Sequence, residues 1–234
     1  MFHFKKFSID DSKAAMKIGT DAVLLGAWTP CGNESRILDI GTGTGILALM
    51  MAQRNKNIPI DAVELESEAA ALAAENVKLS PWFRQIQVFN VPIQTFRLQT
   101  SHTYSLIICN PPFFTNSLKA PDKNRNMARH NDTLPVEELL RITSKLLTEK
   151  GIASFIVPAD AYEIWKAIAA IFSLFPFQVT WIKSSKTHNP NRALVSFTQE
   201  ANAICDENVL SIYISPSVYT KEYQNLTKEF YLKF

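Results

Sequence analysis

The chain has 234 residues, of which 47% are hydrophobic and 20% are charged, and its formal net charge is +2. This length and apolar content allow one sizeable core, and the near-neutral charge excludes a disordered polyampholyte and a strongly basic coating protein. The three cysteines form no CxxC pair, which argues against a disulfide framework and a zinc ribbon.

The sequence shows no signal for export or for a membrane. No long apolar region follows Met1-Phe2-His3-Phe4, and the longest apolar stretches fall short of a membrane span. We therefore expect a reduced, cytoplasmic protein with no membrane partner and no metal, and we expect it to act as a monomer. Because no internal repeat and no second domain is visible, residues 1–234 are predicted to form one domain.

The N-terminal segment predicts a hairpin and then a helix. Phenylalanines alternate loosely between residues 2 and 9, as in a short edge strand or hairpin. Gly19-Thr20-Asp21 looks like a helix start, and residues 22–28 form a compact apolar helix. Thr20 or Asp21 could cap this helix, or could meet a ligand where backbone N–H groups are free; the local sequence favours the cap.

A strand, a glycine loop and a helix follow directly. Residues 36–40 read as a buried strand, Gly41, Gly43 and Gly45 form a G-x-G-x-G loop, and residues 46–54 are helical. Glycines let the backbone approach a ligand, and the helix start supplies unpaired N–H groups. Ile46 stands where a dinucleotide fingerprint has its third glycine, so the loop favours a methionine-derived nucleoside over nicotinamide.

The strand–helix pattern then repeats. Residues 60–64 form a strand that ends at Glu64, about twenty residues past the loop, where a carboxylate can accept hydrogen bonds from both ribose hydroxyls. Glu66 is expected to open the helix over residues 67–79, and a third strand covers residues 86–90. The alternation predicts a doubly wound, mostly parallel α/β sheet with ligands at the carboxyl ends of its strands. That rule gathers the glycine loop, Glu64, the Asn90 region and Asn110 into one cleft.

The four residues Asn110-Pro111-Pro112-Phe113 follow the apolar strand over residues 105–109. Two consecutive prolines stop the strand and give the chain a rigid, extended exit. The Asn110 amide oxygen and the Pro111 carbonyl offer two acceptors, and Phe113 offers a flat apolar face. This set suits a planar base or amide that carries an NH2 group. The plain alternative is a rigid turn with Phe113 in the core.

Two polar segments carry an excess of basic residues. Residues 114–133 lack any period and predict a long mobile loop, and from 119 to 130 four Lys or Arg and one Asp leave an excess of +3. Residues 183–192 have three basic residues and no acid. Either segment could contact a phosphate-bearing substrate, although a solubilising loop would have the same composition. The candidate contacts are Lys119, Lys123, Arg125, Arg129, His130, Lys186 and Arg192. His130 could be a general base, but the chemistry does not require one.

The rest of the chain returns to helices and strands. A helix is predicted over residues 136–147, a strand over 152–158 and a second helix over 162–172. Residues 177–183 and 193–197 predict a closing antiparallel hairpin. The aromatic-rich tail is expected to dock on the body of the protein.

These parts together describe an S-adenosylmethionine-dependent amino-group methyltransferase with a Rossmann-like class I fold. An exocyclic amine is a poor nucleophile, because its lone pair is delocalised into the ring. Hydrogen bonds from the amine to Asn110 and Pro111 would favour a pyramidal nitrogen and accept its developing charge. Stacking on Phe113, at the end of the rigid Pro111-Pro112 exit, would orient the ring toward the methyl donor.

Over nearly its whole length the chain resembles the bacterial tRNA(Val) adenine-N6-methyltransferases, which modify adenine 37 beside the anticodon. The specific part is MKIGTDAVLLGAW from Met16 to Trp28. The remaining matches are FKKF at 4–7, LDIGTGTG at 38–45, NPPF at 110–113, ARH at 128–130, YT at 219–220 and FYL at 230–232. The resemblance implies methylation of N6 in the anticodon stem-loop of a tRNA.

The resemblance also assigns site residues. It makes residues 1–30 an N-terminal extension that contributes to the cofactor site. The residues implied at the cofactor are Lys17, Gly19, Thr20, Asp39, Gly41 and Glu64, with Asp39 and Gly41 at its methionine part, Glu64 on its ribose, and Asn110 on the target amine. One departure concerns the acid that such enzymes often carry after the third strand, which binds the cofactor adenine. Here Asn90-Val91-Pro92-Ile93 has Pro92 at that position, so either backbone groups or Asn90 could serve.

Four other functions share parts of this pattern. A DNA adenine methyltransferase has the same tetrapeptide but usually needs an added target-recognition region. A protein-glutamine methyltransferase uses a related motif but is expected to carry an N-terminal helical domain. A guanine-N2 RNA methyltransferase fits the tetrapeptide equally well. A cofactor-binding RNA chaperone without activity is the alternative outside the enzymes, because a fold alone does not prove turnover.

Overall fold

A computed structural model describes residues 1–12, 14, 17–32, 34–112 and 134–234 of the chain. Its main strands are β3 (Ile37–Ile40), β4 (Ile60–Glu64), β5 (Ile86–Asn90), β6 (Tyr104–Cys109), β7 (Leu147–Pro158), β8 (Phe175–Ser185), β9 (Arg192–Thr198), β10 (Asp206–Ser215) and β11 (Val218–Tyr219). Its helices are α1 (Thr20–Trp28), α2 (Ile46–Arg54), α3 (Ser67–Lys78), α4 (Ile93–Gln99), α6 (Val136–Leu146), α7 (Tyr162–Ile171) and α8 (Lys221–Thr227), with a 3-10 turn at Ala159–Ala161.

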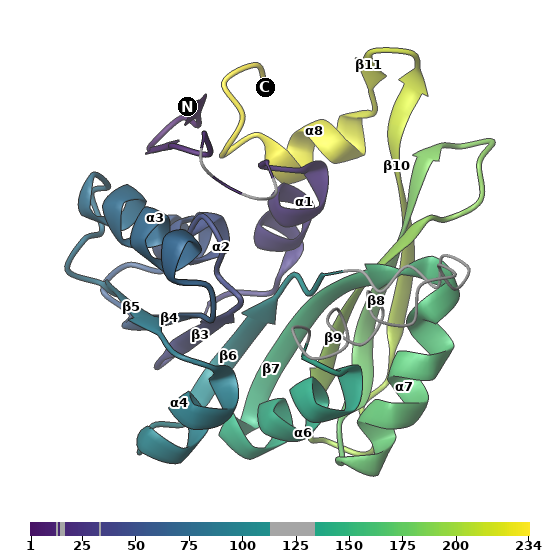
Figure 1. Cartoon of the computed structure of the whole chain (residues 1–234). Helices are drawn as coiled ribbons and strands as arrows, with labels where there is room; N and C mark the ends of the chain where they lie inside the picture. The colour runs from purple at the N-terminus through teal and green to yellow at the C-terminus, as the bar shows by residue number, and fades with distance from the viewer. Residues whose placement is uncertain (13, 15–16, 33, 113–133) are drawn as a thin grey trace, which may run out of the picture.

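Within the described residues, one sheet holds nine strands in the order β11-β10-β8-β9-β7-β6-β3-β4-β5 (Figure 1). The pairs β3–β4, β3–β6, β4–β5 and β6–β7 are parallel, whereas β9 pairs antiparallel with both β7 and β8. The predicted fold class is therefore confirmed, including the antiparallel C-terminal hairpin.

Helices cover both faces of this sheet and bury two apolar clusters (Figure 1). On one face α1, α2, α3 and α8 contribute residues such as Leu24 and Met50. On the other face α4, α6 and α7 contribute Phe96, Leu140 and Trp165. In α6 the buried positions recur at helical spacing on one side, so its amphipathic sequence determines which face meets the sheet.

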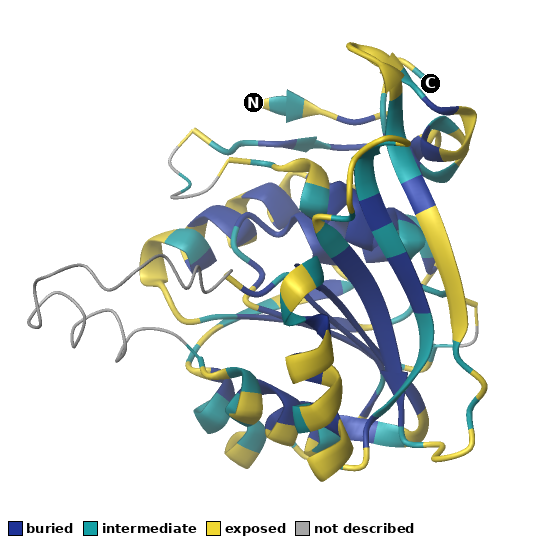
Figure 2. Cartoon of the chain, turned by 90° about the vertical axis from the view of Figure 1, so that its right-hand side faces the viewer, coloured by how far each residue is buried: buried dark blue, intermediate teal, exposed yellow. Residues whose placement is uncertain are grey.

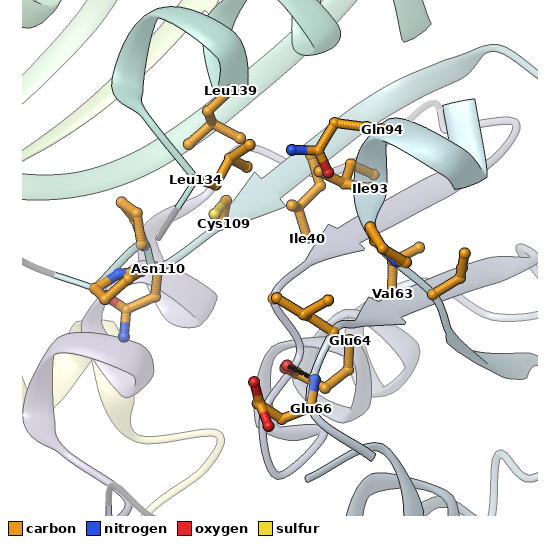
Figure 3. A pocket seen from close by; sticks show the side chains of 16 residues that line it. Ile40, Val63, Glu64, Glu66, Ile93, Gln94, Cys109, Asn110, Leu134 and Leu139 are labelled. Carbon is orange, nitrogen blue, oxygen red and sulfur yellow. Dashed lines mark hydrogen bonds between the residues drawn. The ribbon is translucent and has the colours of Figure 1, made fainter. Parts of the chain in front are cut away.

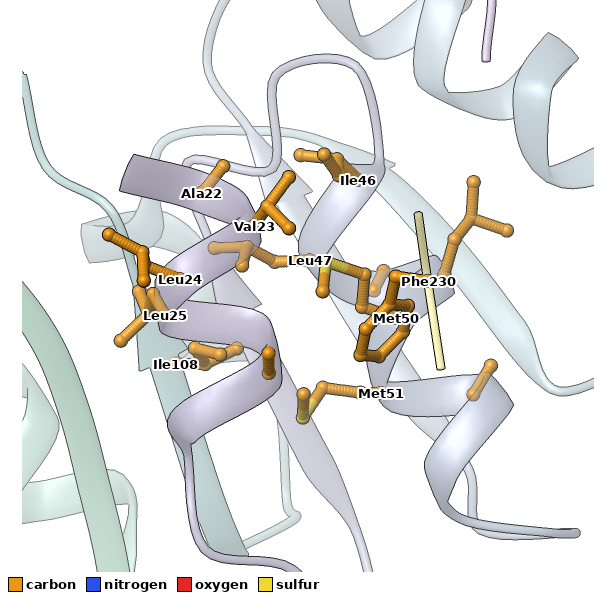
Figure 4. Close-up of a cluster of buried hydrophobic side chains, with 14 of the residues drawn as sticks. Ala22, Val23, Leu24, Leu25, Ile46, Leu47, Met50, Met51, Ile108 and Phe230 are labelled. Carbon is orange, nitrogen blue, oxygen red and sulfur yellow. The ribbon is translucent and has the colours of Figure 1, made fainter. Parts of the chain in front are cut away.

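The helices α1 and α2 approach each other closely (Figure 4). A Cβ atom added at Gly26 would lie 2.6 Å from the Met50 sulfur, so a glycine permits this approach. One guanidinium nitrogen of Arg54 donates to the carbonyls of Gly26 and Thr29, at 2.7 Å each, and so closes the end of α1. These contacts hold α1 against α2, the helix that follows the glycine loop.

The two ends of the described chain pack together. The predicted N-terminal hairpin is confirmed as β1 (Phe2–His3) paired antiparallel with β2 (Ser8–Ile9). Phe4 and Phe7, in the loop that joins these two strands, stack with ring centroids 4.7 Å apart. The Lys5 backbone N–H donates to the Phe230 carbonyl at 2.9 Å. The aromatic tail therefore docks on the body, as predicted.

Three details of the chain differ from the sequence-based prediction. Residues 93–99 form α4, where only a short connection was expected, because Pro92 begins a helix too short to show a clear period. The strand β7 begins at Leu147 rather than at residue 152, with an irregular register near Tyr104. Residues 206–215 form β10, which pairs parallel with β8. This strand was not predicted because its first residues are exposed and acidic and show no hydrophobic pattern (Figure 2).

The predicted capping of α1 by Thr20 or Asp21 was wrong. Gly19 is the residue before the helix, and no side chain caps the helix start. Thr20 is already in the first turn, so its hydroxyl cannot reach the N–H groups that a cap satisfies. The Asp21 carboxylate instead accepts a hydrogen bond from Arg192 Nε at 3.0 Å, which links α1 to β9.

A buried ion pair at the amino ends of the strands joins β3, β4 and β6. The Asp61 carboxylate, 2% exposed, accepts two hydrogen bonds of 2.9 Å from Arg36 and one of 2.6 Å from the Tyr104 hydroxyl. Burial of Asp61 without its cation would cost far more than the loss of a surface pair. This edge of the sheet is opposite to the one where the glycine loop begins.

We predict that Arg36→Leu lowers the free energy of unfolding by about 3–5 kcal/mol, because it leaves Asp61 buried without its cation. Urea unfolding measures this change. Arg84→Leu is the matched control, since Arg84 is exposed and its guanidinium lies over the neighbouring Phe83 ring, and it should change stability by no more than ~0.5 kcal/mol. Equal effects of the two substitutions would contradict a structural role for the ion pair.

Candidate functional site

A cavity of about 550 Å³ opens at the carboxyl ends of the parallel strands (Figure 3). The ends of β3, β4 and β6, the segment after β5 and the start of α6 all contribute to it. Its lining residues are Ile40, Gly41, Val63, Glu64, Leu65, Glu66, Val91, Pro92, Ile93, Gln94, Cys109, Asn110, Pro111, Pro112, Leu134 and Leu139. Parallel strands bring these segments to one edge, as the sequence predicted for Gly41, Glu64 and Asn110.

The glycine loop turns back on itself between β3 and α2. Gly41, Gly43 and Gly45 have φ angles of 69°, 58° and 84°, which residues with a side chain rarely adopt. This conformation explains the G-x-G-x-G spacing. The Gly43 N–H donates to Glu64 Oε2 at 2.8 Å, so the loop and the end of β4 are held together.

Glu64 lies at the centre of the site. Its second oxygen, Oε1, accepts from the backbone N–H of Glu66 at 3.0 Å. Each carboxylate oxygen has lone-pair capacity beyond these single bonds, so the group can still accept from two hydroxyls of a ligand. Glu66 immediately precedes α3, as predicted, and its side chain also lines the cavity.

Asp39 lies beneath the glycine loop rather than in the cavity wall. Its Oδ2 accepts from the Thr42 hydroxyl and from the Ala48 N–H, the latter at 3.1 Å. Its Oδ1 is buried without a hydrogen-bond partner among the described residues. Burial raises the pKa of Asp39 to about 7, and the nearby Glu64 charge adds to this rise, while the two hydrogen bonds oppose it.

Asn110 follows β6 directly and faces the cavity (Figure 3). The strand ends at Cys109, as the two prolines predicted, and Pro111 is buried while Pro112 is exposed. The Asn110 side-chain oxygen is buried and has no partner in the part of the chain described here. A buried amide oxygen without a partner among the described residues is uncommon, and such an oxygen can accept a hydrogen bond from a ligand that carries an NH2 group.

The Cys109 thiol also lines the cavity and is buried. Burial raises its pKa well above the ordinary value, and the charges of Asp39 and Glu64 act in the same direction. Cys109 therefore stays protonated at neutral pH.

Other predicted cofactor residues lie outside the cavity wall. The Lys17 ammonium donates to the backbone carbonyls of Asp11 and Ser12, and Gly19 and Thr20 begin α1. The Asn90 amide nitrogen donates to the carbonyls of Glu64 and Leu65 at 3.1 and 2.9 Å, and its oxygen accepts from the Ser67 hydroxyl at 2.9 Å. Asn90 thus holds the end of β4, and its contact with the cofactor stays a prediction.

The predicted substrate contacts are divided between described and undescribed parts of the chain. Lys186 is exposed in the β8–β9 turn, and Arg192 is paired with Asp21. Outside the described residues lie Phe113, Lys119, Lys123, Arg125, Arg129 and His130.

Sequence reasoning missed much of the apolar cavity wall. The segment after β5 was expected at the cofactor, but Leu65 after β4, Gln94 in α4, and Leu134 and Leu139 before and within α6 were not. The signal that could have found the first two groups is position, because each comes soon after a strand that ends at the cleft. The third group gives no local signal, since it reaches the cavity only through packing of α6 on the sheet.

The described residues show neither a membrane helix nor a metal cluster. No helix among them is long and apolar enough to cross a membrane. No group of three or more His, Cys, Asp or Glu side chains among them could hold a metal ion.

Comparisons with known proteins show the family of the chain. The family model "Methyltransferase small domain" matches residues 12–163, more than half of the chain. The tRNA1(Val) (adenine(37)-N6)-methyltransferase of Flavobacterium psychrophilum is 43% identical over 234 residues and covers 100% of both chains. The protein of the same name from Bacteroides fragilis is 46% identical over 236 residues, covering 99% of this chain and 98% of its own.

The chain belongs to the tRNA1(Val) (adenine(37)-N6)-methyltransferase family. The resemblance seen in the sequence is thereby confirmed. Solved structures support the methyltransferase fold of this family member. A "predicted O-methyltransferase" from Agrobacterium tumefaciens has a TM-score of 0.72 at 19% identity, over 90% of this chain and 96% of its own. A methyltransferase from Pyrococcus furiosus has a TM-score of 0.52 at 16% identity, over 76% and 80%.

We predict that Asp39 makes the stability of this methyltransferase depend on pH. Its pKa rises from 3.8 in the unfolded chain to about 7 in the folded protein, so the folded state holds the proton more tightly. The contribution of Asp39 to stability is therefore full below pH 4 and is lost as the pH rises to 7, by an amount on the order of 4 kcal/mol.

The comparison of wild type with Asp39→Asn isolates this effect, because asparagine can accept the same hydrogen bonds but does not ionise. The difference in unfolding free energy between variant and wild type should grow in favour of the variant from pH 4 to 7 and then level off. Asp160→Asn, at an exposed position, serves as the control and should give a curve parallel to wild type. A parallel curve for Asp39→Asn as well would refute the assignment.

Proposed function

We propose that this protein transfers a methyl group from S-adenosylmethionine to the N6 amine of adenine 37 in the anticodon loop of tRNA(Val). The observation that carries the proposal is the buried Asn110 side-chain oxygen, which has no partner among the described residues and lies in the same cavity as Glu64. The full-length relatives named for this reaction support the same substrate.

The residues that line the cavity fit this cofactor. Two carboxylates, Glu64 and Glu66, and no Lys or Arg belong to the described lining, so the cavity favours a cationic ligand such as a sulfonium. Bound S-adenosylmethionine supplies an electrophilic methyl group on its sulfur. Glu64 would accept hydrogen bonds from the ribose hydroxyls. Gly41 and the buried Asp39 would hold the methionine part, with Oδ1 of Asp39 still free to accept a hydrogen bond.

Asn110 and Pro111 would act on the target amine. Their two oxygens accept the N–H groups of an adenine, which draws the nitrogen lone pair out of conjugation and stabilises the positive charge that develops on it. The rigid Pro111-Pro112 exit keeps both acceptors at the cavity edge. Because the nitrogen would attack before it loses a proton, no side chain has to be deprotonated beforehand. The bond between sulfur and methyl would break as the bond between methyl and nitrogen forms, and the extra proton on the nitrogen would then leave to solvent.

An RNA substrate agrees with the placement of the β8–β9 turn. Since β8 runs parallel to β7 and β6, this turn lies at the same edge of the sheet as Asn110. Lys186 is exposed there and can contact a phosphate. A base in a single-stranded loop leaves its stack at the lowest cost, which favours an anticodon loop over a duplex.

We further propose that residues 1–234 work as one domain and as a monomer. The nine-stranded sheet of the described residues passes between both apolar clusters and so joins them into one unit. A tRNA substrate implies that the enzyme acts in the cytoplasm.

The test of the function is methylation of total tRNA with a labelled methyl donor, followed by mapping of the modified nucleoside. We expect N6-methyladenosine at position 37 of tRNA(Val). Asn110→Ala should lower the rate at least about 100-fold, because a preorganised acceptor of transition-state charge is lost, while cofactor affinity stays within a few-fold. Asn202→Ala, at an exposed position between β9 and β10, is the control and should retain full activity.

Two results would overturn the proposal. Label in DNA or protein instead of tRNA would assign a different substrate class. Equal methylation rates for Asn110→Ala and wild type would contradict the proposed role of Asn110 at the target amine.

We predict that Glu64→Gln weakens cofactor binding about 10–100-fold, because a charged acceptor of ribose hydrogen bonds is replaced by a neutral one. Isothermal titration with S-adenosylhomocysteine measures this affinity. Glu66→Gln tests the neighbouring carboxylate of the cavity, and Glu68→Gln, exposed in the first turn of α3, is the matched control. A large loss for Glu66→Gln with no loss for Glu64→Gln would reverse the assignment.

A further inference from the structure

Gln94 is a polar residue in an otherwise apolar end of the cavity. It lies in the first turn of α4, and its half-buried side chain points from this helix toward Ile40 and Leu134 (Figure 3). Within the part of the chain that the structure describes, its amide makes no hydrogen bond. A carboxamide in such a place has a donor and an acceptor ready for a ligand.

The neighbours of Gln94 offer no competing side chain. The Asn90 amide is bonded to the carbonyls of Glu64 and Leu65 and to the Ser67 hydroxyl, and Asn90 does not belong to the described cavity lining. Pro92 has neither a backbone N–H nor a polar side chain. Of the lining residues that follow β5, Gln94 alone brings a polar side chain to the described cavity wall.

The position of Glu64 determines which part of a nucleoside reaches Gln94. Because β5 lies next to β4, a base attached to a ribose at Glu64 extends over the end of β5. Leu65, Val91 and Ile93 line that space. Leu65 is 49% exposed, although it is a large apolar residue, so a flat base could cover it.

We propose that Gln94 binds the hydrogen-bonding edge of the cofactor's adenine and so determines the specificity of the site for that base. Its amide oxygen accepts from the exocyclic amine, and its amide N–H donates to the adjacent ring nitrogen. A carboxamide matches adenine in this paired manner. The inference rests on the proposed function and adds to it the residue that distinguishes adenine from other bases at the cofactor.

The experiment is a thermodynamic cycle: the affinities of two ligands, which differ in one group, are measured on two proteins, which differ in one residue. Titration calorimetry compares S-adenosylhomocysteine with its analogue that lacks the 6-amino group, on wild type and on Gln94→Leu. In wild type, loss of the amine should weaken binding about tenfold, because the Gln94 oxygen loses its donor. In Gln94→Leu the same loss should weaken binding less than about twofold.

Gln99→Leu is the matched control, since Gln99 is exposed at the last position of the same helix. Removal of the 6-amino group from the ligand should weaken its binding to this variant about tenfold, as in wild type. Methylation assays in parallel give the KM for tRNA, which should stay within about twofold of wild type in Gln94→Leu.

Two outcomes would overturn the inference alone. One is that removal of the 6-amino group weakens ligand binding by the same factor in wild type and in Gln94→Leu. The other is a raised KM for tRNA in Gln94→Leu with unchanged binding of both nucleosides, which would assign Gln94 to the target base. A wild-type protein that binds neither nucleoside and methylates no tRNA would overturn the proposed function together with the inference.

Discussion

Parallel pairing of β6, β3, β4 and β5 is the constraint on which the site depends. The register places Asp39 beside Ala62 and Ile108, so Gly41, Glu64 and Asn110 come together a few residues later. At the opposite edge, Asp61 ties Arg36 and Tyr104 together and so fixes three strands at their amino ends. A shift of one residue in this pairing would move every group of the cleft at once.

The cleft keeps polar groups that the fold itself does not satisfy. One oxygen of Asp39 and one of Asn110 are buried without a partner among the described residues, at a cost in stability that a packed apolar core would avoid. Both are close to the glycine loop or the end of β6, where backbone geometry is also constrained. Buried polar atoms without a partner, which lower stability, are characteristic of ligand sites rather than of apolar cores.

Local sequence signals predicted the parts of the fold that depend on neighbouring residues. The glycine loop, α2 and the stop after β6 each depend on a few adjacent side chains, and all were predicted correctly. Long-range contacts decided the rest. Arg192 binds the Asp21 carboxylate, which therefore does not cap α1, and the Asn90 amide binds the end of β4. Gln94 carried no motif, because its place in the cavity wall depends on how α4 packs.

Burial of the Cys109 thiol has a consequence for the durability of the enzyme. A protein that holds a reactive alkylating agent risks alkylation of its own side chains, and a thiolate would be the most reactive of them. Cys109 lines the cavity, yet its raised pKa keeps it as the neutral thiol, which is a weak nucleophile. The same protonated state slows oxidation of the sulfur. The neutral thiol thus limits alkylation of Cys109 by the methyl donor during the time before the RNA binds.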